Sequence, residues 1–165
     1  MRYSRIRSTD ISNGPGFRVS IFVQGCTRHC DKCFNPETWD FNGGRPFTDV
    51  TMDRFISFGD SREIIGYSIL GGEPLQQGKD MLNLVKTIKE KQPEKTIWMW
   101  TGFTFEELNE EQKEIIKYVD VLVDGPFIEK CQCPNVRFKG STNQRVIDIK
   151  ATLEQETIVL YDTLK

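Results

Sequence analysis

The chain has 165 residues, of which 38% are hydrophobic and 28% charged, and its net charge is −2 at pH 7. This length predicts one domain over residues 1–165 with a core of its own, and the balanced charge provides no basic field for nucleic acid. No apolar run approaches the ~18–20 residues that a membrane span needs. The sequence therefore predicts a cytoplasmic protein with no membrane and no nucleic acid among its partners.

The first expected strand covers residues 18–24 and follows a dense turn signal, Asn13-Gly14-Pro15-Gly16. Its apolar residues indicate a buried strand, which brings Gly25 and a cysteine-rich loop to its carboxyl end. After an irregular stretch, Thr48 is expected to cap a helix over residues 49–58.

The remaining elements alternate between strand and helix. Strands are expected at residues 64–70, 96–101, 119–123 and 146–149, with a further short strand at 157–161, and helices at 79–91 and 104–117. Apolar spacing of three and four residues supports the first of these helices, and Thr104 with Glu107 forms a capping box for the second. Residues 129–141 are expected to form an excursion from this pattern.

This alternation predicts parallel strands joined by right-handed helical crossovers. A complete barrel of eight strand–helix units needs about 250 residues, and the chain has 165. We therefore expect an α/β fold, a partial (β/α) barrel of about five to six mainly parallel strands that is open on one side.

Three cysteines, Cys26, Cys30 and Cys33, lie within one short polar loop, where packing does not explain them. Four cysteines usually hold a 4Fe-4S cluster, whereas three leave one iron open for a small molecule. The alternative is a structural zinc site completed by His29, Cys131 or Cys133, and the spacing alone leaves both metals open. An odd total of five cysteines argues against a secreted disulfide framework.

A second loop, Gly71-Gly72-Glu73-Pro74, follows the strand expected at residues 64–70. It could be an ordinary strand-to-helix turn, or its backbone and the Glu73 carboxylate could hold the amino-acid end of a ligand. Its position favours the ligand, because parallel strands place their carboxyl ends at one edge of a sheet. Thr101-Gly102 and Asp124-Gly125 are expected at the same edge.

Two other features have open interpretations. Trp98 and Trp100 point to one side of their strand and are expected in the core rather than against a cofactor. Cys131 and Cys133 could form a metal pair, a strained disulfide or two incidental thiols.

The cysteine loop and the Gly71–Pro74 loop together resemble those of the radical S-adenosylmethionine superfamily. Within it, the chain is similar to the activating proteins of anaerobic ribonucleoside-triphosphate reductase over nearly its whole length. The further motifs that carry this similarity are Asn13-Gly14-Pro15-Gly16, residues 35–39, 98–102 and 123–125, and Gly140-Ser141-Thr142-Asn143-Gln144.

The resemblance implies a 4Fe-4S cluster with three irons bound by Cys26, Cys30 and Cys33 and the fourth chelated by S-adenosyl-L-methionine. The residues that would contact or border this cofactor are Lys32, Cys33, Phe34, Gly71, Gly72, Glu73 and Pro74. The superfamily often carries an aromatic residue where this chain has Lys32. No catalytic residue is implied beyond the cluster ligands.

The implied activity is that of an activase. A low-potential donor such as a flavodoxin would reduce the cluster, and S-adenosylmethionine would be cleaved to a 5'-deoxyadenosyl radical. That radical would generate a glycyl radical on the catalytic subunit of the reductase. The alternatives are an activating enzyme of another glycyl-radical protein, of the formate-lyase type, and a non-catalytic zinc or electron-transfer module.

Overall fold

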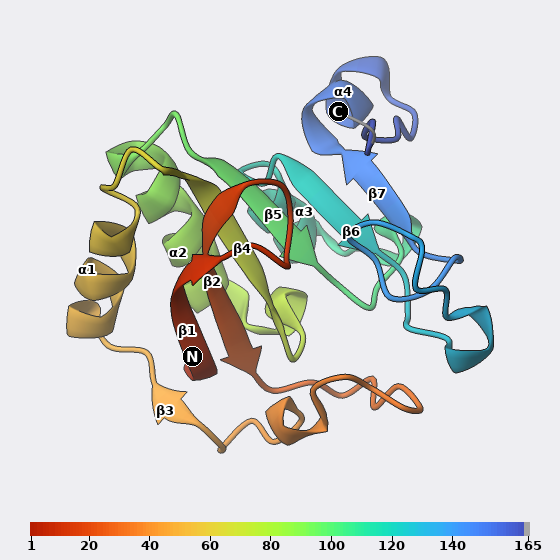
Figure 1. Ribbon diagram of the computed structural model, residues 1–165, viewed down its shortest axis with the longest axis horizontal. Coiled ribbons are helices and arrows are strands. Elements are labelled where there is room, and N and C mark those ends of the chain that lie inside the picture. Colours follow the sequence, from red (N-terminus) through yellow and green to blue (C-terminus); the bar gives the residue numbers. More distant parts are fainter. Residues whose placement is uncertain (164–165) are drawn as a thin grey trace.

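The computed structural model describes residues 1–163. Within them, seven strands form one sheet in the order β3-β1-β2-β4-β5-β6-β7 (Figure 1). The strands are β1 (Arg2–Asp10), β2 (Phe17–Gln24), β3 (Arg45–Pro46), β4 (Ile64–Gly71), β5 (Thr96–Trp100), β6 (Val121–Asp124) and β7 (Arg145–Asp148). The α-helices are α1 (Asp49–Phe58), α2 (Gly78–Lys91), α3 (Glu110–Ile116) and α4 (Ile149–Gln155).

The sheet is parallel in its centre and antiparallel at both edges. Strands β2, β4, β5 and β6 run parallel, whereas β1 and β3 on one side and β7 on the other pair in antiparallel fashion. The α/β class is confirmed, and the sheet does not close. The expectation of five to six mainly parallel strands was wrong at the edges, where β1, β3 and β7 bring the total to seven and run antiparallel. The predicted partial barrel is therefore matched only in part.

Strand β1 accounts for most of this difference. Residues 2–10 carry three arginines, which hide the alternation expected of a strand, although Tyr3 is buried in the core. The turn at residues 13–16 sends the chain back beside β1 as β2, which makes an antiparallel pair. Physically, one row of charged side chains is compatible with a strand when the other row is buried.

The main core lies between the sheet and the helices. Alternate residues of β2, among them Val19, Ile21 and Val23, are fully buried and pack there, as the period of two along a strand requires. Helix α2 contributes Met81, Leu84, Val85 and Ile88. In Figure 1, α2 and α3 lie behind the sheet.

The opposite face carries a smaller apolar cluster. Trp98 packs there with Val121, Val123 and Val146, and Phe138 from the segment after β6 packs against them. Trp98 is buried as expected, whereas Trp100 is only half-buried and donates a hydrogen bond of 2.6 Å from Nε1 to the Phe138 carbonyl. The excursion after β6 thus folds over this face of the sheet.

Three helix boundaries test the capping predictions. Thr48 caps α1 as expected, because its side chain accepts a hydrogen bond from Thr51 N. The Thr104–Glu107 capping box is present, but it caps a 3-10 turn, Phe105–Glu107, and α3 begins only at Glu110 behind a second box formed by Asn109 and Gln112. Helix α4 was not expected.

At residues 157–161, where a strand was expected, an isolated bridge joins Leu160 to Ile147. In the part of the chain that the structure describes, no helix has both the length and the apolar character to cross a membrane.

Candidate metal and cofactor site

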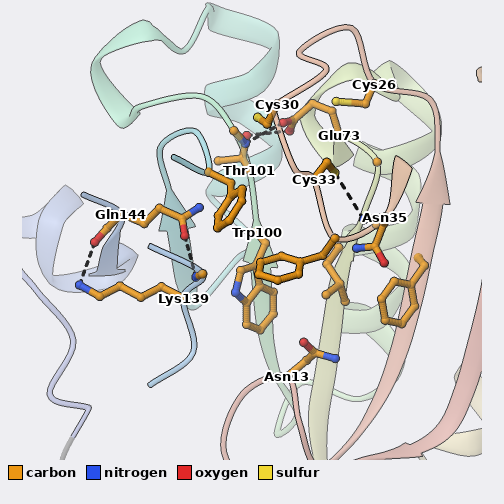
Figure 2. A pocket seen from close by; sticks show the side chains of 18 of the residues that line it. Asn13, Cys26, Cys30, Cys33, Asn35, Glu73, Trp100, Thr101, Lys139 and Gln144 are labelled. Atoms are coloured by element: carbon orange, nitrogen blue, oxygen red, sulfur yellow. Dashed lines mark hydrogen bonds between the residues drawn. The ribbon is translucent and has the colours of Figure 1, made fainter. Parts of the chain in front are cut away.

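A cavity of about 530 Å³ lies on the face of the sheet opposite α2 and α3 (Figure 1) and reaches the carboxyl ends of its parallel strands. Figure 2 shows Cys26, Cys30 and Glu73 at one end of this cavity and Asn13 at the other. Loops that follow β2, β4, β5 and β6 all contribute to the lining, through Cys26, Gly72, Thr101 and Gly125. Its volume lies within the usual range for small-molecule sites.

The backbone holds the cysteine loop against the loop after β4. Glu73 N donates to the Gly25 carbonyl at 2.8 Å, and Gly72 N donates to the Val23 carbonyl at the same distance. A side-chain Cβ at Gly72 would lie only 2.6 Å from the Gly25 carbonyl oxygen. The glycines therefore permit the two loops to approach each other this closely.

Two non-glycine residues in the cysteine loop have left-handed backbone conformations. They are His29, with φ of 46°, and Lys32, with φ of 58°. Lys32 lies in a turn closed by a hydrogen bond of 3.1 Å from Cys33 N to the Cys30 carbonyl, and Cys26, Cys30 and Cys33 all line the cavity. The His29 ring is stacked on the Trp39 ring, with 4.3 Å between centroids.

The three cysteines are half-buried and unpaired. Burial raises the pKa of the Cys26 thiol, and hydrogen bonds from the backbone of Arg28 and His29 only partly offset this effect. Cysteines bind metals as thiolates. A bound cation must therefore offset the cost of forming a thiolate in this half-buried position.

The donor set fits an iron–sulfur group in its chemistry, because soft thiolates suit such clusters. No three His, Cys, Asp or Glu side chains within residues 1–163 form a group that could hold a single metal ion. A cluster takes one thiol at each iron, so its ligands need not converge on one point.

Glu73 lies buried beside the cysteines with its carboxylate fixed by three donors. Oε1 accepts from the Thr101 hydroxyl at 2.6 Å and from Leu75 N at 3.1 Å, and Oε2 accepts from Gly102 N at 2.7 Å. Burial raises the pKa of Glu73, while these hydrogen bonds lower it and leave a net increase. The carboxylate thus joins the loops after β4 and β5 at the cavity wall (Figure 2).

The residues expected to border a cofactor divide into two groups. Cys33, Phe34, Gly71, Gly72 and Glu73 line the cavity, and the Phe34 ring packs on Phe127 at 4.7 Å between centroids. Among the described residues, Lys32 and Pro74 are not part of the lining: Lys32 is exposed, and Pro74 is buried at the start of the 3-10 turn Pro74–Gln76. The Glu73 side chain caps that turn, so the loop is also an ordinary turn.

Cys131 and Cys133 lie elsewhere, in the excursion after β6. They are half-buried, and the cavity lining within residues 1–163 does not include them. Asp124, at the end of β6, is buried and accepts hydrogen bonds from Phe105 N at 2.8 Å and from Arg145. Its contacts are structural, and only the neighbouring Gly125 reaches the cavity.

Sequence reasoning missed the other end of the cavity, where Ser12 and Asn13 lie. A fully buried arginine, Arg18, supports them: Nε donates to Ser68 Oγ at 2.8 Å, and Ser68 Oγ donates to the Asn13 carbonyl at 2.6 Å. Burial lowers the pKa of Arg18 to about 10. The sequence did carry one signal for this end of the cavity, namely an arginine, Arg18, inside an otherwise apolar strand.

Sequence comparisons give the family of the chain. Residues 12–147 match the family model described as a 4Fe-4S single cluster domain. A protein of Escherichia coli (strain K12) named anaerobic ribonucleoside-triphosphate reductase-activating protein is 41% identical over 150 residues, which cover 88% of this chain and 97% of the relative. The protein of that name from Enterobacteria phage T4 is 42% identical over 148 residues, covering 88% of this chain and 93% of the relative.

Proposed function

Because the chain belongs to the family of anaerobic ribonucleoside-triphosphate reductase-activating proteins, we propose that it generates a glycyl radical on that reductase by cleaving S-adenosylmethionine at a 4Fe-4S cluster. One observation carries the proposal. Cys26, Cys30, Cys33 and the Gly71–Glu73 loop line the same cavity, although β3, α1 and most of β4 lie between them in the sequence. Iron ligands and a loop suited to an amino-acid group thus share one site.

In this proposal, Cys26, Cys30 and Cys33 each hold one iron. The fourth iron stays available to the cofactor, since Cys131 and Cys133 lie outside the cavity lining that residues 1–163 provide. When bound, such a cluster supplies the low-potential electron that breaks a carbon–sulfur bond of the sulfonium. A low-potential protein such as a flavodoxin would be the electron donor.

The chain's own residues bind and orient the cofactor. Gly71 and Gly72 would lie against its amino-acid end, and the fixed carboxylate of Glu73 would accept a hydrogen bond from the amino group. Phe34 and Trp100 provide an apolar wall around the rest of the cofactor. Lys32 and Pro74 act indirectly, by setting the turn before Cys33 and the turn after Glu73.

With the cofactor bound, one electron from the reduced cluster would convert S-adenosylmethionine to methionine and a 5'-deoxyadenosyl radical, and that radical would take a hydrogen atom from a glycine α-carbon of the reductase's catalytic subunit. The products are 5'-deoxyadenosine and the glycyl radical. Glycine has no side chain to prevent close approach of a reacting atom, and the open sheet leaves one side of the cavity free for a loop of the partner.

Activation of the reductase tests the proposal. The reconstituted, anaerobically reduced protein would be mixed with S-adenosylmethionine and the reductase catalytic subunit, and the glycyl radical counted by electron paramagnetic resonance. We expect radical formation with this chain and none with Cys30→Ser. A parallel mixture with a formate-lyase type protein should stay silent; radical formation there and not on the reductase would assign the chain to that other target.

A further inference from the structure

Two cysteines outside the cavity, Cys131 and Cys133, are not used by the proposed function. Cys131 ends the 3-10 turn Glu129–Cys131, at the outer end of the excursion between β6 and β7 (Figure 1), and Cys133 follows two residues later. Both are half-buried, and both are free thiols. Partially exposed thiols are the ones that react with disulfides, so this pair is accessible to such chemistry.

The backbone around the pair is fixed by hydrogen bonds. Cys131 N donates to the Ile128 carbonyl at 2.9 Å, and the Cys131 carbonyl accepts from Thr142 N at 2.8 Å. Gln132, which lies between the two cysteines, forms an antiparallel bridge with the fully buried Ser141. The segment that carries the thiols is therefore anchored to the chain that leads into β7.

The conformation of Gln132 brings the two cysteines within reach of each other. Its φ of −62° and ψ of 131° are those of an extended, polyproline II residue. Such a residue advances the chain by about 3.1 Å, so the Cα atoms of Cys131 and Cys133 lie roughly 6 Å apart. Disulfides join cysteines whose Cα atoms are about 4.4–6.8 Å apart. Gln132 is exposed whereas both cysteines are half-buried, so the cysteine side chains lie away from the one between them.

The surroundings of the pair carry more positive than negative charge. Residues 127–140 contain Lys130, Arg137 and Lys139 but only one carboxylate, that of Glu129. Reactive cysteines typically lie in partially exposed, electropositive places of this kind. A disulfide compound that bears carboxylates would be attracted to the same charges.

We propose that Cys131 and Cys133 form a thiol–disulfide exchange site for small disulfides that bear carboxylates, with glutathione disulfide as the probe. The thiolate of one cysteine attacks a sulfur of the disulfide, which forms a mixed disulfide and releases one glutathione. The thiolate of the other cysteine then displaces the second glutathione and closes a Cys131–Cys133 disulfide. In total the two cysteines lose two electrons and two protons, and glutathione disulfide takes them up to become two molecules of glutathione.

The single residue between the cysteines makes the bridged form easy to reduce. A ring this small departs from relaxed disulfide geometry, and such strain raises the reduction potential of the bond. The pair therefore returns to its dithiol form when glutathione is in excess. This exchange goes beyond the proposed function and does not involve the cluster, because both cysteines lie outside the cavity lining that residues 1–163 provide.

Alkylation of the remaining thiols tests the proposal. The cluster-reconstituted protein would be equilibrated anaerobically with glutathione disulfide and glutathione in varied ratios, quenched with acid, alkylated and digested with trypsin. Cleavage after Lys130 and Arg137 places both cysteines in one peptide, residues 131–137, apart from the three cysteines of the cysteine loop. Mass spectrometry would distinguish this peptide with two alkyl groups, with an internal bridge or with bound glutathione.

We expect this peptide to change from two alkyl groups to none as glutathione disulfide replaces glutathione. The bridged form should exceed the glutathionylated form by about tenfold, because a neighbouring thiol has an effective concentration in the millimolar range. Excess glutathione should restore both thiols. Cys133→Ser removes the second thiol and should stop at the mixed disulfide, whereas Asn135→Ser, an exposed change in the same peptide, should behave as the wild type.

Two results would overturn the proposal. Two alkyl groups at every ratio would mean that the cysteines are incidental thiols, and a wild-type protein that stops at the mixed disulfide would mean that they cannot bridge. Glycyl-radical formation by Cys131→Ser/Cys133→Ser, measured in parallel, separates this outcome from the proposed function. We expect the wild-type radical yield, and a lost radical would contradict the independence of the two sites.

Discussion

The Thr101 hydroxyl donates a hydrogen bond of 2.6 Å to Glu73 across the ends of the adjacent parallel strands β4 and β5. Both side chains are buried, and the amide of Gly102 adds a second contact to the same carboxylate. The loop after β5 thereby fixes Glu73, the proposed ligand group in the loop after β4. Geometry at the site thus depends on a residue that need not touch the ligand.

Replacing Thr101 with valine tests this dependence. Thr101→Val keeps the branched shape but removes the donor to a buried carboxylate oxygen. The variant should lose about 1–3 kcal/mol of unfolding free energy in urea titrations, the cost of an unsatisfied buried acceptor. In Thr87→Val, which alters a partly exposed hydroxyl on α2, the loss should stay near 0.5 kcal/mol. Equal losses would contradict the role given to Thr101.

Gly71 should be intolerant of any side chain. Its φ is +113°, and a Cβ there would lie 2.6 Å from Val23 N, which is backbone and cannot move aside. Gly71→Ala should therefore destabilise the protein by about 3 kcal/mol or more in urea unfolding.

Gly78→Ala is the matched control for Gly71→Ala. Gly78 also has a positive φ, of +61°, but the nearest atom to its Cβ position is a Glu111 side-chain oxygen at 3.4 Å. The substitution should cost only about 1–2 kcal/mol, the strain of a left-handed conformation. If both alanine variants lost the same stability, the close approach of the β2 and β4 backbones would not be the cause.

Asp10 should make stability depend on acid pH. Burial raises the pKa of Asp10, but hydrogen bonds from Asn13, Ser20 and Ser12 together lower it by more. The net result is a pKa below the ordinary value of 3.8. Since the folded-state pKa is the lower one, the stabilisation is complete above pH 3.8 and is lost as pH falls through the folded-state value.

Urea unfolding across this pH range checks the prediction for Asp10. Asp10→Asn should be less stable than the wild type at pH 7 and should show a smaller loss on acidification. Asp53→Asn, an exposed change on α1, should follow the wild-type curve. A curve for Asp10→Asn that stays parallel to the wild type down to acid pH would show that the carboxylate does not contribute.

The cysteines outside the cavity should be dispensable for the cluster. Cys131 and Cys133 belong to the excursion after β6 and lie apart from the lining that the described residues form. The double variant Cys131→Ser/Cys133→Ser should keep wild-type iron content and visible absorbance after anaerobic reconstitution, whereas Cys33→Ser should lose the stable cluster. Loss of iron in the double variant would indicate a closed, four-cysteine site.

The central strands and the two ligand loops could be predicted because their signals are local. Apolar runs such as residues 64–70 indicate buried strands, and parallel strands bring their carboxyl ends to one edge. The cysteine loop and the Gly71–Glu73 loop consequently line one cavity, as expected from the sequence.

The rest depends on tertiary contacts that a single sequence does not display. Strand β1 carries Arg5 and Arg7 on the face of the sheet that bears the cavity, where both guanidinium groups lie over the Phe22 ring of the neighbouring strand. Only this pairing explains their place in a strand. Similarly, the Thr104–Glu107 box predicted a helix start, but it caps a 3-10 turn and the helix begins behind a second box.

The electron paramagnetic resonance spectrum of the reconstituted, reduced protein, with and without S-adenosylmethionine, tests the central claim most directly. A cluster held by Cys26, Cys30 and Cys33 leaves one iron without a protein ligand. We predict a reduced-cluster signal whose g-values shift when S-adenosylmethionine is added. A cluster signal unchanged by the cofactor, or bound zinc with no cluster, would contradict the account.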